Sequence, residues 1–279
     1  MKVLLISANK ETAPYPVYPL GLDYVAAAIK DKHRLRIADM NPLKSADALV
    51  EELEAFAPDM IGISIRNVDN TDACDPKSFT ADYQRLIRHI RQHTAAPIVL
   101  GGSGFNIFPR DMLEHLNADY GIIGEGERFA LFLDAWQENR DCRQVPGVIQ
   151  RGSQPGNGMP PPWQGPLKRH FTPDMPHVAH YLENGGMLNL QTKRGCPFNC
   201  IYCTYPLIEG RRLRLIPPAE AAETAYRLQA AGARYLFITD STFNADPEHS
   251  MAVARAFKTI GIRIPWGAYI APARMPADY

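Results

Sequence analysis

Cysteine is scarce in this sequence, with five residues among 279. An odd number of cysteines fits poorly with the disulfide framework of a small secreted protein. Charge of one sign is missing too, because 30 acidic and 30 basic side chains cancel, so no strong field for nucleic acid or an anionic membrane is predicted. The apolar stretch at residues 1–6 is too short for a signal peptide or a membrane span. We therefore expect a cytoplasmic protein with no membrane span and no nucleic-acid partner.

Residues 2–150 alternate short apolar runs with amphipathic stretches, which is typical of a parallel sheet with helical crossovers. Strands are predicted at Val3–Ile6, Leu35–Ala38, Met60–Ile65, Ile98–Leu100, Tyr120–Ile123 and Val145–Gln150. Helices are predicted between them, at about 20–31, 45–56, 79–93, 109–116 and 126–138. The region 1–150 is thus expected to be a doubly wound, Rossmann-like α/β domain, whose ligands bind beyond the carboxyl ends of the strands.

Proline and glycine are concentrated in residues 151–186, which are predicted to form a linker, partly in extended polyproline conformation. A second βα series follows in residues 187–279. Its predicted strands are 187–191, 235–239 and 264–269, and its predicted helices are 218–231 and 247–260.

Three of the five cysteines, Cys196, Cys200 and Cys203, lie within eight positions. Three thiolates on one loop can bind three irons of a cubane [4Fe-4S] cluster, whereas a cluster for electron transfer alone normally takes four cysteines. The fourth iron would then be open to a substrate or cofactor. A zinc site would need four ligands, commonly in CxxC pairs, and disulfide bonds or idle thiols are the remaining roles for such cysteines. Cys74 and Cys142 are expected to act as small apolar residues.

The CxxxCxxC spacing, with Tyr202 before the last cysteine, resembles the radical S-adenosylmethionine (SAM) family. The resemblance implies that the three cysteines bind a [4Fe-4S] cluster whose open iron chelates SAM, and that Tyr202 lies near the adenine; packing inside the barrel is the alternative for Tyr202. It also implies a partial TIM-type (β/α) barrel of about six βα units. Since only three strands are predicted in 187–279, we expect the first half of a barrel in a fragment of a longer protein; a second chain that supplies the rest is the alternative.

The segment Thr239–Asn244 follows the second predicted strand of this region. It occupies the place of the family's glycine-rich, acidic segment, which holds the methionyl amino group of SAM, although the glycines are absent here. Asp240 and Ser241 are the expected SAM contacts, since a carboxylate or hydroxyl can accept a hydrogen bond from an ammonium. The alternative is that both cap the following helix. Tyr269, at the end of the third strand, is expected to face the SAM pocket.

Residues 1–150 resemble the cobalamin (B12)-binding domain that precedes the barrel in one subgroup of the family. The matching stretches are Pro19–Leu22, Ile63–Arg66, Val99–Gly104 and Ile123–Glu127. The resemblance implies a cobalamin site made by residues at the strand ends, namely Ser64, Arg66, Asn67, Gly101, Gly102, Ser103, Gly104, Gly124, Glu125 and Gly126. Glycines would let the flat corrin approach the backbone. The DxHxxG motif, which supplies a histidine to cobalt in the methionine synthase type, is absent, so Arg66 or Asn67 is the expected neighbour of the lower face.

Together these resemblances imply a cobalamin-dependent radical SAM enzyme. It would cleave SAM reductively to a 5′-deoxyadenosyl radical and methylate an unactivated carbon, and no residue beyond the cluster ligands is assigned a catalytic role. A radical SAM cyclase or rearrangement enzyme, and a non-catalytic cobalamin-sensing or docking module, are the alternatives. The expected cofactors are a [4Fe-4S] cluster, SAM and cobalamin. The expected partners are a small-molecule, lipid or natural-product substrate, which the residues do not identify, and an electron donor such as flavodoxin or ferredoxin.

Overall fold

The computed structural model describes residues 1–153 and 160–272. The chain divides into two compact units. Unit 1 consists of Met1–Lys10 and Gly21–Phe171, and unit 2 consists of Glu11–Leu20 and Thr172–Tyr279. The predicted linker is therefore shared between the two units, and a short stretch near the start of the chain belongs with the second one.

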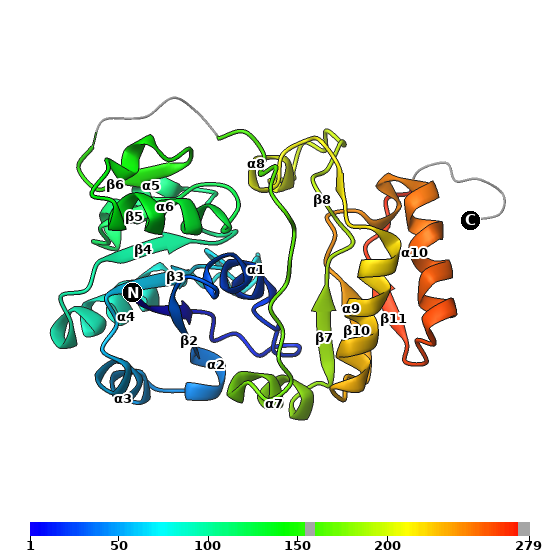
Figure 1. The fold of residues 1–279 in the computed structure, drawn as a ribbon, viewed down its shortest axis with the longest axis horizontal. Coiled ribbons are helices and arrows are strands. Elements are labelled where there is room, and N and C mark those ends of the chain that lie inside the picture. Colours follow the sequence, from blue (N-terminus) through cyan, green and yellow to red (C-terminus); the bar gives the residue numbers. More distant parts are fainter. Residues whose placement is uncertain (154–159, 273–279) are drawn as a thin grey trace. The chain divides into compact units, whose positions relative to one another are not determined.

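Unit 1 is built on a six-stranded sheet with the strand order β2-β1-β3-β4-β5-β6 (Figure 1). The strands are β1 (Lys2–Ser7), β2 (Arg34–Asp39), β3 (Met60–Ser64), β4 (Ile98–Gly101), β5 (Tyr120–Ile122) and β6 (Val148–Gln150). The first five are parallel, and β6 pairs antiparallel with β5. This order places a topological switch point between β1 and β3, where doubly wound sheets bind ligands beyond the carboxyl ends of the strands.

Helices cover both faces of this sheet, as a doubly wound fold requires. They are α1 (Leu20–Ile29), α2 (Met40–Leu43), α3 (Ala46–Phe56), α4 (Thr80–His93), α5 (Pro109–His115) and α6 (Arg128–Gln137), with a 3₁₀ turn η1 (Cys142–Gln144). Apolar residues of α3, α4 and α5 share one core with Leu4 and Ile63 of the sheet. Those of α1 and α6 share a second core with Val3 and Leu5. The predicted fold class is confirmed.

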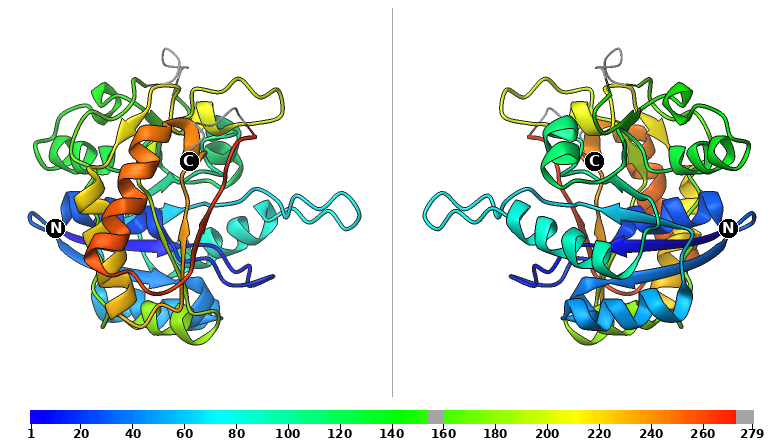
Figure 2. Two further views of the ribbon diagram at one scale, coloured as in Figure 1. Left: turned by 90° about the vertical axis from the view of Figure 1, so that its right-hand side faces the viewer. Right: turned by 90° about the vertical axis from the view of Figure 1, so that its left-hand side faces the viewer.

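Local signals explain where the helices begin and end. Ser45 caps α3, because its hydroxyl accepts a hydrogen bond from the amide of Ala48 (3.1 Å). The same helix ends at Ala57, whose φ of 49° takes the backbone into the left-handed region. A long loop joins β3 to α4, and Figure 2 shows it extending away from the sheet.

Residues 160–171 pack on unit 1 instead of forming a free linker. A carboxylate oxygen of Glu125 accepts a hydrogen bond from the amide of Trp163 (2.5 Å). Further along, Arg169 Nε lies 2.6 Å from Asp23 Oδ2, and both side chains are almost completely buried. The linker prediction missed these contacts, because proline content indicates an extended chain and does not reveal where side chains fasten it.

Unit 2 contains a parallel sheet with the order β11-β10-β7. Its strands are β7 (Met187–Leu190), β10 (Tyr235–Ile238) and β11 (Trp266–Ala268), and its long helices are α9 (Pro218–Ala230) and α10 (Pro247–Ile260). The two helices pack against each other beside the sheet (Figure 1). Adjacent parallel strands joined by helices are the repeating element of a (β/α) barrel, as the sequence predicted.

Four short elements of unit 2 were not predicted, nor was a second 3₁₀ turn, η2 (Phe243–Ala245). They are α7 (Pro176–Glu183), β8 (Lys193–Arg194), α8 (Tyr205–Ile208) and β9 (Arg214–Leu215). Helix α7 lies in the predicted linker and begins at Pro176, because proline is well tolerated in the first turn of a helix. In the part of the chain that the structure describes, no helix is long and apolar enough to cross a bilayer.

His177 lies on α7, buried within unit 2 beside Tyr18. The hydroxyl of Tyr18 is 3.3 Å from His177 Nε2, and the two rings are stacked. Burial lowers the pKa of His177 to about 4, whereas a histidine in an unfolded chain titrates near pH 6.5. The folded protein therefore keeps this imidazole neutral at a pH where the unfolded chain binds a proton.

We expect the free energy of unfolding of unit 2 to fall as the pH drops from roughly 6.5 to 4, because protons then favour the unfolded chain. The contribution of His177 is fully present above that window, and its loss amounts to at most about 3 kcal/mol. The variant His177→Gln cannot ionise, so it should show a shallower pH dependence in urea unfolding. An equal slope in both proteins would contradict the assignment.

Candidate active site

The three cysteines lie on the loop between β8 and α8 of unit 2. Cys196 is buried, Cys203 is half-buried and Cys200 is exposed. Gly195 precedes the first of them with a φ of 90°, and a Cβ at this position would overlap the carbonyl oxygen of Arg212, so only glycine fits. The loop therefore holds its first thiol against the protein and leaves the second open to solvent.

The thiols suit an iron–sulfur cluster in number and chemistry, although the structure does not gather them at one point. Within residues 1–153 and 160–272, no three His, Cys, Asp or Glu side chains surround a metal position. The amide of Cys203 donates to the carbonyl of Cys200 (3.2 Å), so these two residues share one tight turn. Zinc would need a fourth protein ligand in a structural site, and residues 195–204 contain no histidine or carboxylate. Three thiolates therefore match a cubane with one iron free of protein ligands.

A polar network supports the base of the loop. The amide of Gly195 donates to Glu209 Oε2 (3.0 Å), and Gln191 Nε2 donates to Glu209 Oε1 (2.9 Å). Desolvation raises the pKa of Glu209, and the neighbouring Arg194 opposes that rise. The sequence analysis did not predict this carboxylate, whose only signal is its place beside a glycine shortly after the cysteines.

Asp240 lies two residues after the end of β10, and its carboxylate is fully buried. Oδ1 accepts hydrogen bonds from the amides of Thr192 (2.7 Å) and Lys193 (3.2 Å), and Lys193 Nζ lies 2.9 Å from Oδ2. These protein donors occupy the carboxylate in this structure, and the expected contact with the methionyl amino group stays a prediction. The capping alternative is wrong for Asp240, because Asp246 caps α10 through the amide of His249 (3.0 Å).

The other predicted SAM contacts are Ser241 after β10, Tyr269 after β11 and Tyr202 on the cysteine loop. Ser241 donates to the carbonyl of Gly195 (2.9 Å). Tyr202 is 86% exposed, and the neighbouring Cys200 raises its pKa. Tyr269 is 62% exposed, with its ring edge-on to Phe237. Both tyrosines offer ring surface to a ligand, and their contacts with SAM stay predictions.

In unit 1, the loops after β3 and β4 lie against each other at the carboxyl edge of the sheet. Gly102 has a φ of 102°, and a Cβ there would overlap the carbonyl oxygen of Ile65. A Cβ on Gly104 would lie 2.9 Å from the carbonyl oxygen of Arg66, to which Ser103 also donates a hydrogen bond (2.9 Å). The glycines of this turn thus allow two loops to pack closely, a reason that the sequence analysis did not foresee.

Asn106 ties the loop after β5 to the loop after β4. This buried side chain donates from Nδ2 to the carbonyl of Gly124 (3.1 Å) and accepts from the amide of the same residue through Oδ1 (2.9 Å). The sequence analysis missed it, because a single asparagine in a loop has no pattern. Glu125, predicted as a cobalamin contact, accepts the hydrogen bond from the amide of Trp163.

The structure thus brings the predicted cobalamin residues to three neighbouring loops at one edge of unit 1. They are Ser64, Arg66 and Asn67 at the end of β3, Gly101, Gly102, Ser103 and Gly104 at the end of β4, and Gly124, Glu125 and Gly126 after β5. Residues 65–79, 102–108 and 123–127 contain no histidine, so these loops supply no imidazole to a cobalt ion. Whether the ten residues contact cobalamin stays a prediction.

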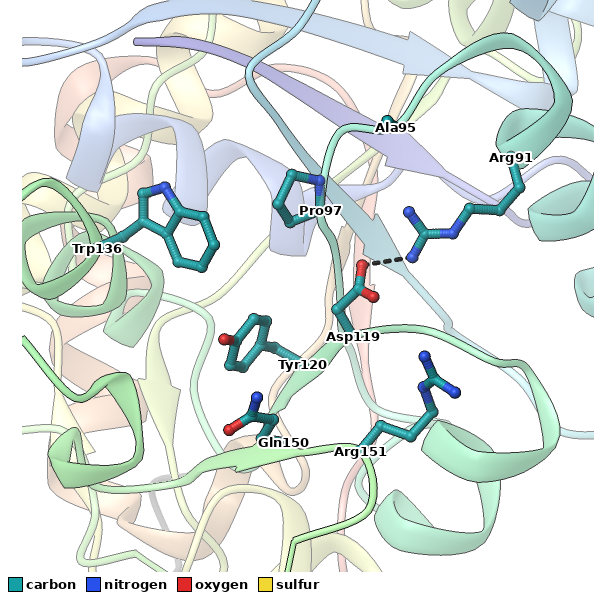
Figure 3. Close-up of a pocket in the computed structure, with 8 residues that line it drawn as sticks. All are labelled: Arg91, Ala95, Pro97, Asp119, Tyr120, Trp136, Gln150 and Arg151. Atoms are coloured by element: carbon teal, nitrogen blue, oxygen red, sulfur yellow. Dashed lines mark hydrogen bonds and ion pairs between the residues drawn. The ribbon is translucent and has the colours of Figure 1, made fainter. Parts of the chain in front are cut away.

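A separate hollow of about 290 Å³ lies at the opposite, amino edge of the same sheet (Figure 3). Pro97 and Asp119, which precede β4 and β5, line it. Arg91 forms an ion pair with Asp119, whose carboxylate also accepts from the amide of Ile98 (2.7 Å). These charged groups join strands together, and the hollow is distinct from the edge that carries the predicted site.

Comparison with protein families agrees with this two-part arrangement. The model of the B12 binding domain matches residues 6–131, and the model of the radical SAM superfamily matches residues 190–268. The fold and the site therefore define a B12-binding α/β domain followed by a radical SAM domain. These two domains are the parts of a cobalamin-dependent radical SAM enzyme, the class of protein that the chain resembles.

Named relatives of this family include carbon methyltransferases. The chain is 25% identical to tryptophan 2-C-methyltransferase of Streptomyces laurentii, over 91% of this chain and 51% of that protein. It is 27% identical to hopanoid C-3 methylase of Methylococcus capsulatus, over 88% and 46%. The solved structure of the radical SAM methyltransferase TsrM from Kitasatospora setae, with tryptophan and a SAM analogue bound, matches with a TM-score of 0.79 at 26% identity, over 91% of this chain and 50% of that chain. The chain spans about half the length of the curated relatives that it matches.

Proposed function

We propose that this chain holds the cofactors of a cobalamin-dependent radical SAM enzyme that transfers a methyl group to an unactivated carbon of a small molecule. The observation that carries the proposal is the loop at Cys196, Cys200 and Cys203, which offers three thiols and no fourth ligand. Methyl transfer is favoured over cyclisation or rearrangement because named relatives of this chain are methyltransferases.

The cofactors supply the difficult chemistry of such an enzyme, and the protein positions them and excludes water. When bound, the cluster would provide the electron that splits SAM into methionine and a 5′-deoxyadenosyl radical, and cobalamin would provide the methyl group. Cys196, Cys200 and Cys203 would hold the cluster. Tyr202 and Tyr269 would lie against SAM, since exposed aromatic rings favour stacking on a flat base, and Ser241 would lie close by.

Cobalamin would bind at the carboxyl edge of unit 1, over the loops that follow β3, β4 and β5. Arg66 is exposed at this edge, and it or Asn67 would lie under the lower face of the corrin. The lack of histidine in these loops supports a cobalt without a protein imidazole. The visible spectrum of the bound cobalamin tests this step, because a histidine-ligated spectrum would contradict it.

The purified protein tests the proposal as a whole after anaerobic reconstitution with iron and sulfide. We expect about four irons per chain, a cobalamin spectrum that survives gel filtration, and formation of methionine and 5′-deoxyadenosine from SAM with a low-potential reductant. A protein that takes up no iron would overturn the proposal. Iron and SAM cleavage without retained cobalamin would leave a radical SAM enzyme and remove the cobalamin step.

The remaining partners follow from the same chemistry. A cluster that must be reduced needs an electron donor, for which a flavodoxin or ferredoxin in the cytoplasm is suitable. The substrate is a small molecule, lipid or natural product. Unit 2 does not identify it, since the described strands carry the cofactor loops.

A further inference from the structure

The segment Thr239–Thr242, which leaves β10, runs alongside the segment that leads from β7 into the cysteine loop. Within the two strands, Ile238 is the partner of Leu190 in the parallel ladder. Beyond the ladder, side chains of the segment after β10 bond, one residue after another, to the segment after β7. Thr239 Oγ1 donates to the carbonyl of Leu190 (3.2 Å), and Ser241 Oγ donates to the carbonyl of Gly195 (2.9 Å).

The last pair of this series reaches the first cluster ligand. Thr242 Oγ1 lies 4.0 Å from the sulfur of Cys196. The central pair is Asp240 with Thr192 and Lys193, and all three of these side chains are buried. Successive residues of the first segment therefore contact successive positions of the second, from the end of β7 to the first cysteine.

The hydrogen-bonding capacity of Asp240 is filled inside the protein. A carboxylate offers about four lone-pair positions. Four donors occupy them, which are the amide and hydroxyl of Thr192 and the amide and Nζ of Lys193. No position is left for the ammonium of a ligand.

Lys193 is equally committed. Its ammonium has three donors, and they point at Asp240 Oδ2 (2.9 Å), Thr192 Oγ1 (3.0 Å) and the carbonyl of Phe243 (2.8 Å). A buried ion pair of this kind adds little net stability over apolar residues, but removal of one partner leaves an uncompensated charge. A pair that is costly to bury and fully hydrogen-bonded specifies one arrangement of the two segments.

We propose that Asp240 is a positioning residue for the iron–sulfur cluster, which fixes the backbone entering the cysteine loop through Thr192 and Lys193, and that it does not bind SAM. This inference rests on the proposed function, because it assigns a role toward the cluster. Ser241 acts in the same way through Gly195, one residue before Cys196.

The variant Asp240→Asn tests the inference, since it keeps the size of the side chain but places an amide against the Lys193 ammonium. Mutation of groups that orient metal ligands commonly costs a factor of 10 to 100 in metal affinity. We therefore expect the reconstituted cluster to lose iron to a chelator roughly tenfold faster than in the wild type, with an altered EPR signal of the reduced cluster. SAM binding is measured on the molecules that still carry a cluster, by titration of the SAM-dependent change in the EPR signal. Their affinity for SAM should change by less than about threefold.

Two further variants separate positioning from loss of stability. Ser241→Ala removes one hydrogen bond to Gly195 without leaving a buried charge, so it should fold and lose iron faster than the wild type, by a smaller factor than Asp240→Asn. Val253→Ala creates a cavity in α10, and none of the contacts above involves this residue. It should lower the melting temperature and leave the rate of iron loss unchanged.

The outcomes are distinct. If the cluster in Asp240→Asn is as stable as in the wild type, the inference is overturned. This holds both when SAM binding falls tenfold and when it stays the same. So would a loss of iron in Val253→Ala equal to that in Asp240→Asn at matched destabilisation. If Asp240→Asn does not fold, the Ser241→Ala variant alone tests the inference. Iron loss from Ser241→Ala at the wild-type rate would then overturn it. Failure of the wild-type protein to take up iron would instead overturn the proposed function.

Discussion

Replacement of Cys200 by alanine is expected to leave a folded protein that holds no stable [4Fe-4S] cluster. The side chain is exposed, and substitutions at exposed positions usually change stability by less than about 0.5 kcal/mol. Two remaining thiolates cannot hold a cubane that already lacks a fourth protein ligand. Iron content should fall from about four per chain to below about one, together with the visible absorbance of the cluster and the formation of 5′-deoxyadenosine from SAM.

Cys74 provides the matched control, because it is also exposed and lies in unit 1, outside the cysteine loop. Cys74→Ala should retain the iron content and SAM cleavage of the wild type. The corresponding alanine variants of Cys196 and Cys203 should behave like Cys200→Ala. An anaerobically prepared Cys200→Ala protein with an intact cluster and unchanged SAM cleavage would refute the assignment of the loop.

Replacement of Gly102 by alanine is expected to disrupt the predicted cobalamin edge of unit 1. The residue has a φ of 102°, which is strained for any residue with a Cβ. The added methyl group would also overlap the carbonyl oxygen of Ile65, which is backbone and has no rotamer to adopt. We expect unit 1 to lose about 2–4 kcal/mol of stability. Displacement of the turn at 101–104 should lower cobalamin affinity at least about tenfold, which corresponds to about 1.4 kcal/mol.

Gly21 is the control for this substitution. It lies in α1, and a Cβ there would meet no atom within 4 Å. Gly21→Ala should therefore raise stability by up to about 1 kcal/mol through helix propensity and leave cobalamin binding unchanged. Urea unfolding and titration with cobalamin, followed by visible absorbance, measure both effects on the same samples. Wild-type stability in Gly102→Ala would contradict the described geometry, and wild-type cobalamin affinity would contradict the predicted location of the site.

Periodicity in the sequence was sufficient to predict the sheet of unit 1. The apolar runs at Val3–Ile6 and Met60–Ile65 are short, lack polar alternation and are separated by amphipathic stretches, which is the pattern of strands buried on both faces. Residues 176–183 show where this reasoning failed. They lie at the end of the proline- and glycine-rich stretch 151–186, which indicated a linker. In the structure they form α7, which packs within unit 2 with His177 beside Tyr18.

The candidate site shows the same division. The cysteine spacing predicts the loop and its cofactor, because the separation of ligands along one short loop is a property of the sequence itself. The sequence did not identify Asn106, Glu209 and Lys193. Each of them forms a hydrogen bond with a residue that is distant in sequence: Asn106 with Gly124, Glu209 with Gly195, and Lys193 with Asp240. Nothing in the spacing of these residues indicates that they meet.

The succession of strands and helices, the resemblance to the family and the predicted iron-binding loop follow from local pattern, since alternating βα segments and the CxxxCxxC spacing need no knowledge of distant contacts. Tertiary structure alone decided the surroundings of Asp240. Its position at the end of a strand predicts a group facing a ligand, but parallel pairing of β7 with β10 brings Thr192 and Lys193 over it and fills its hydrogen bonds. Tertiary structure likewise decided that the glycines after β4 accommodate a neighbouring backbone. The sequence of a turn indicates the conformation of that turn, but it does not indicate which segment packs against it.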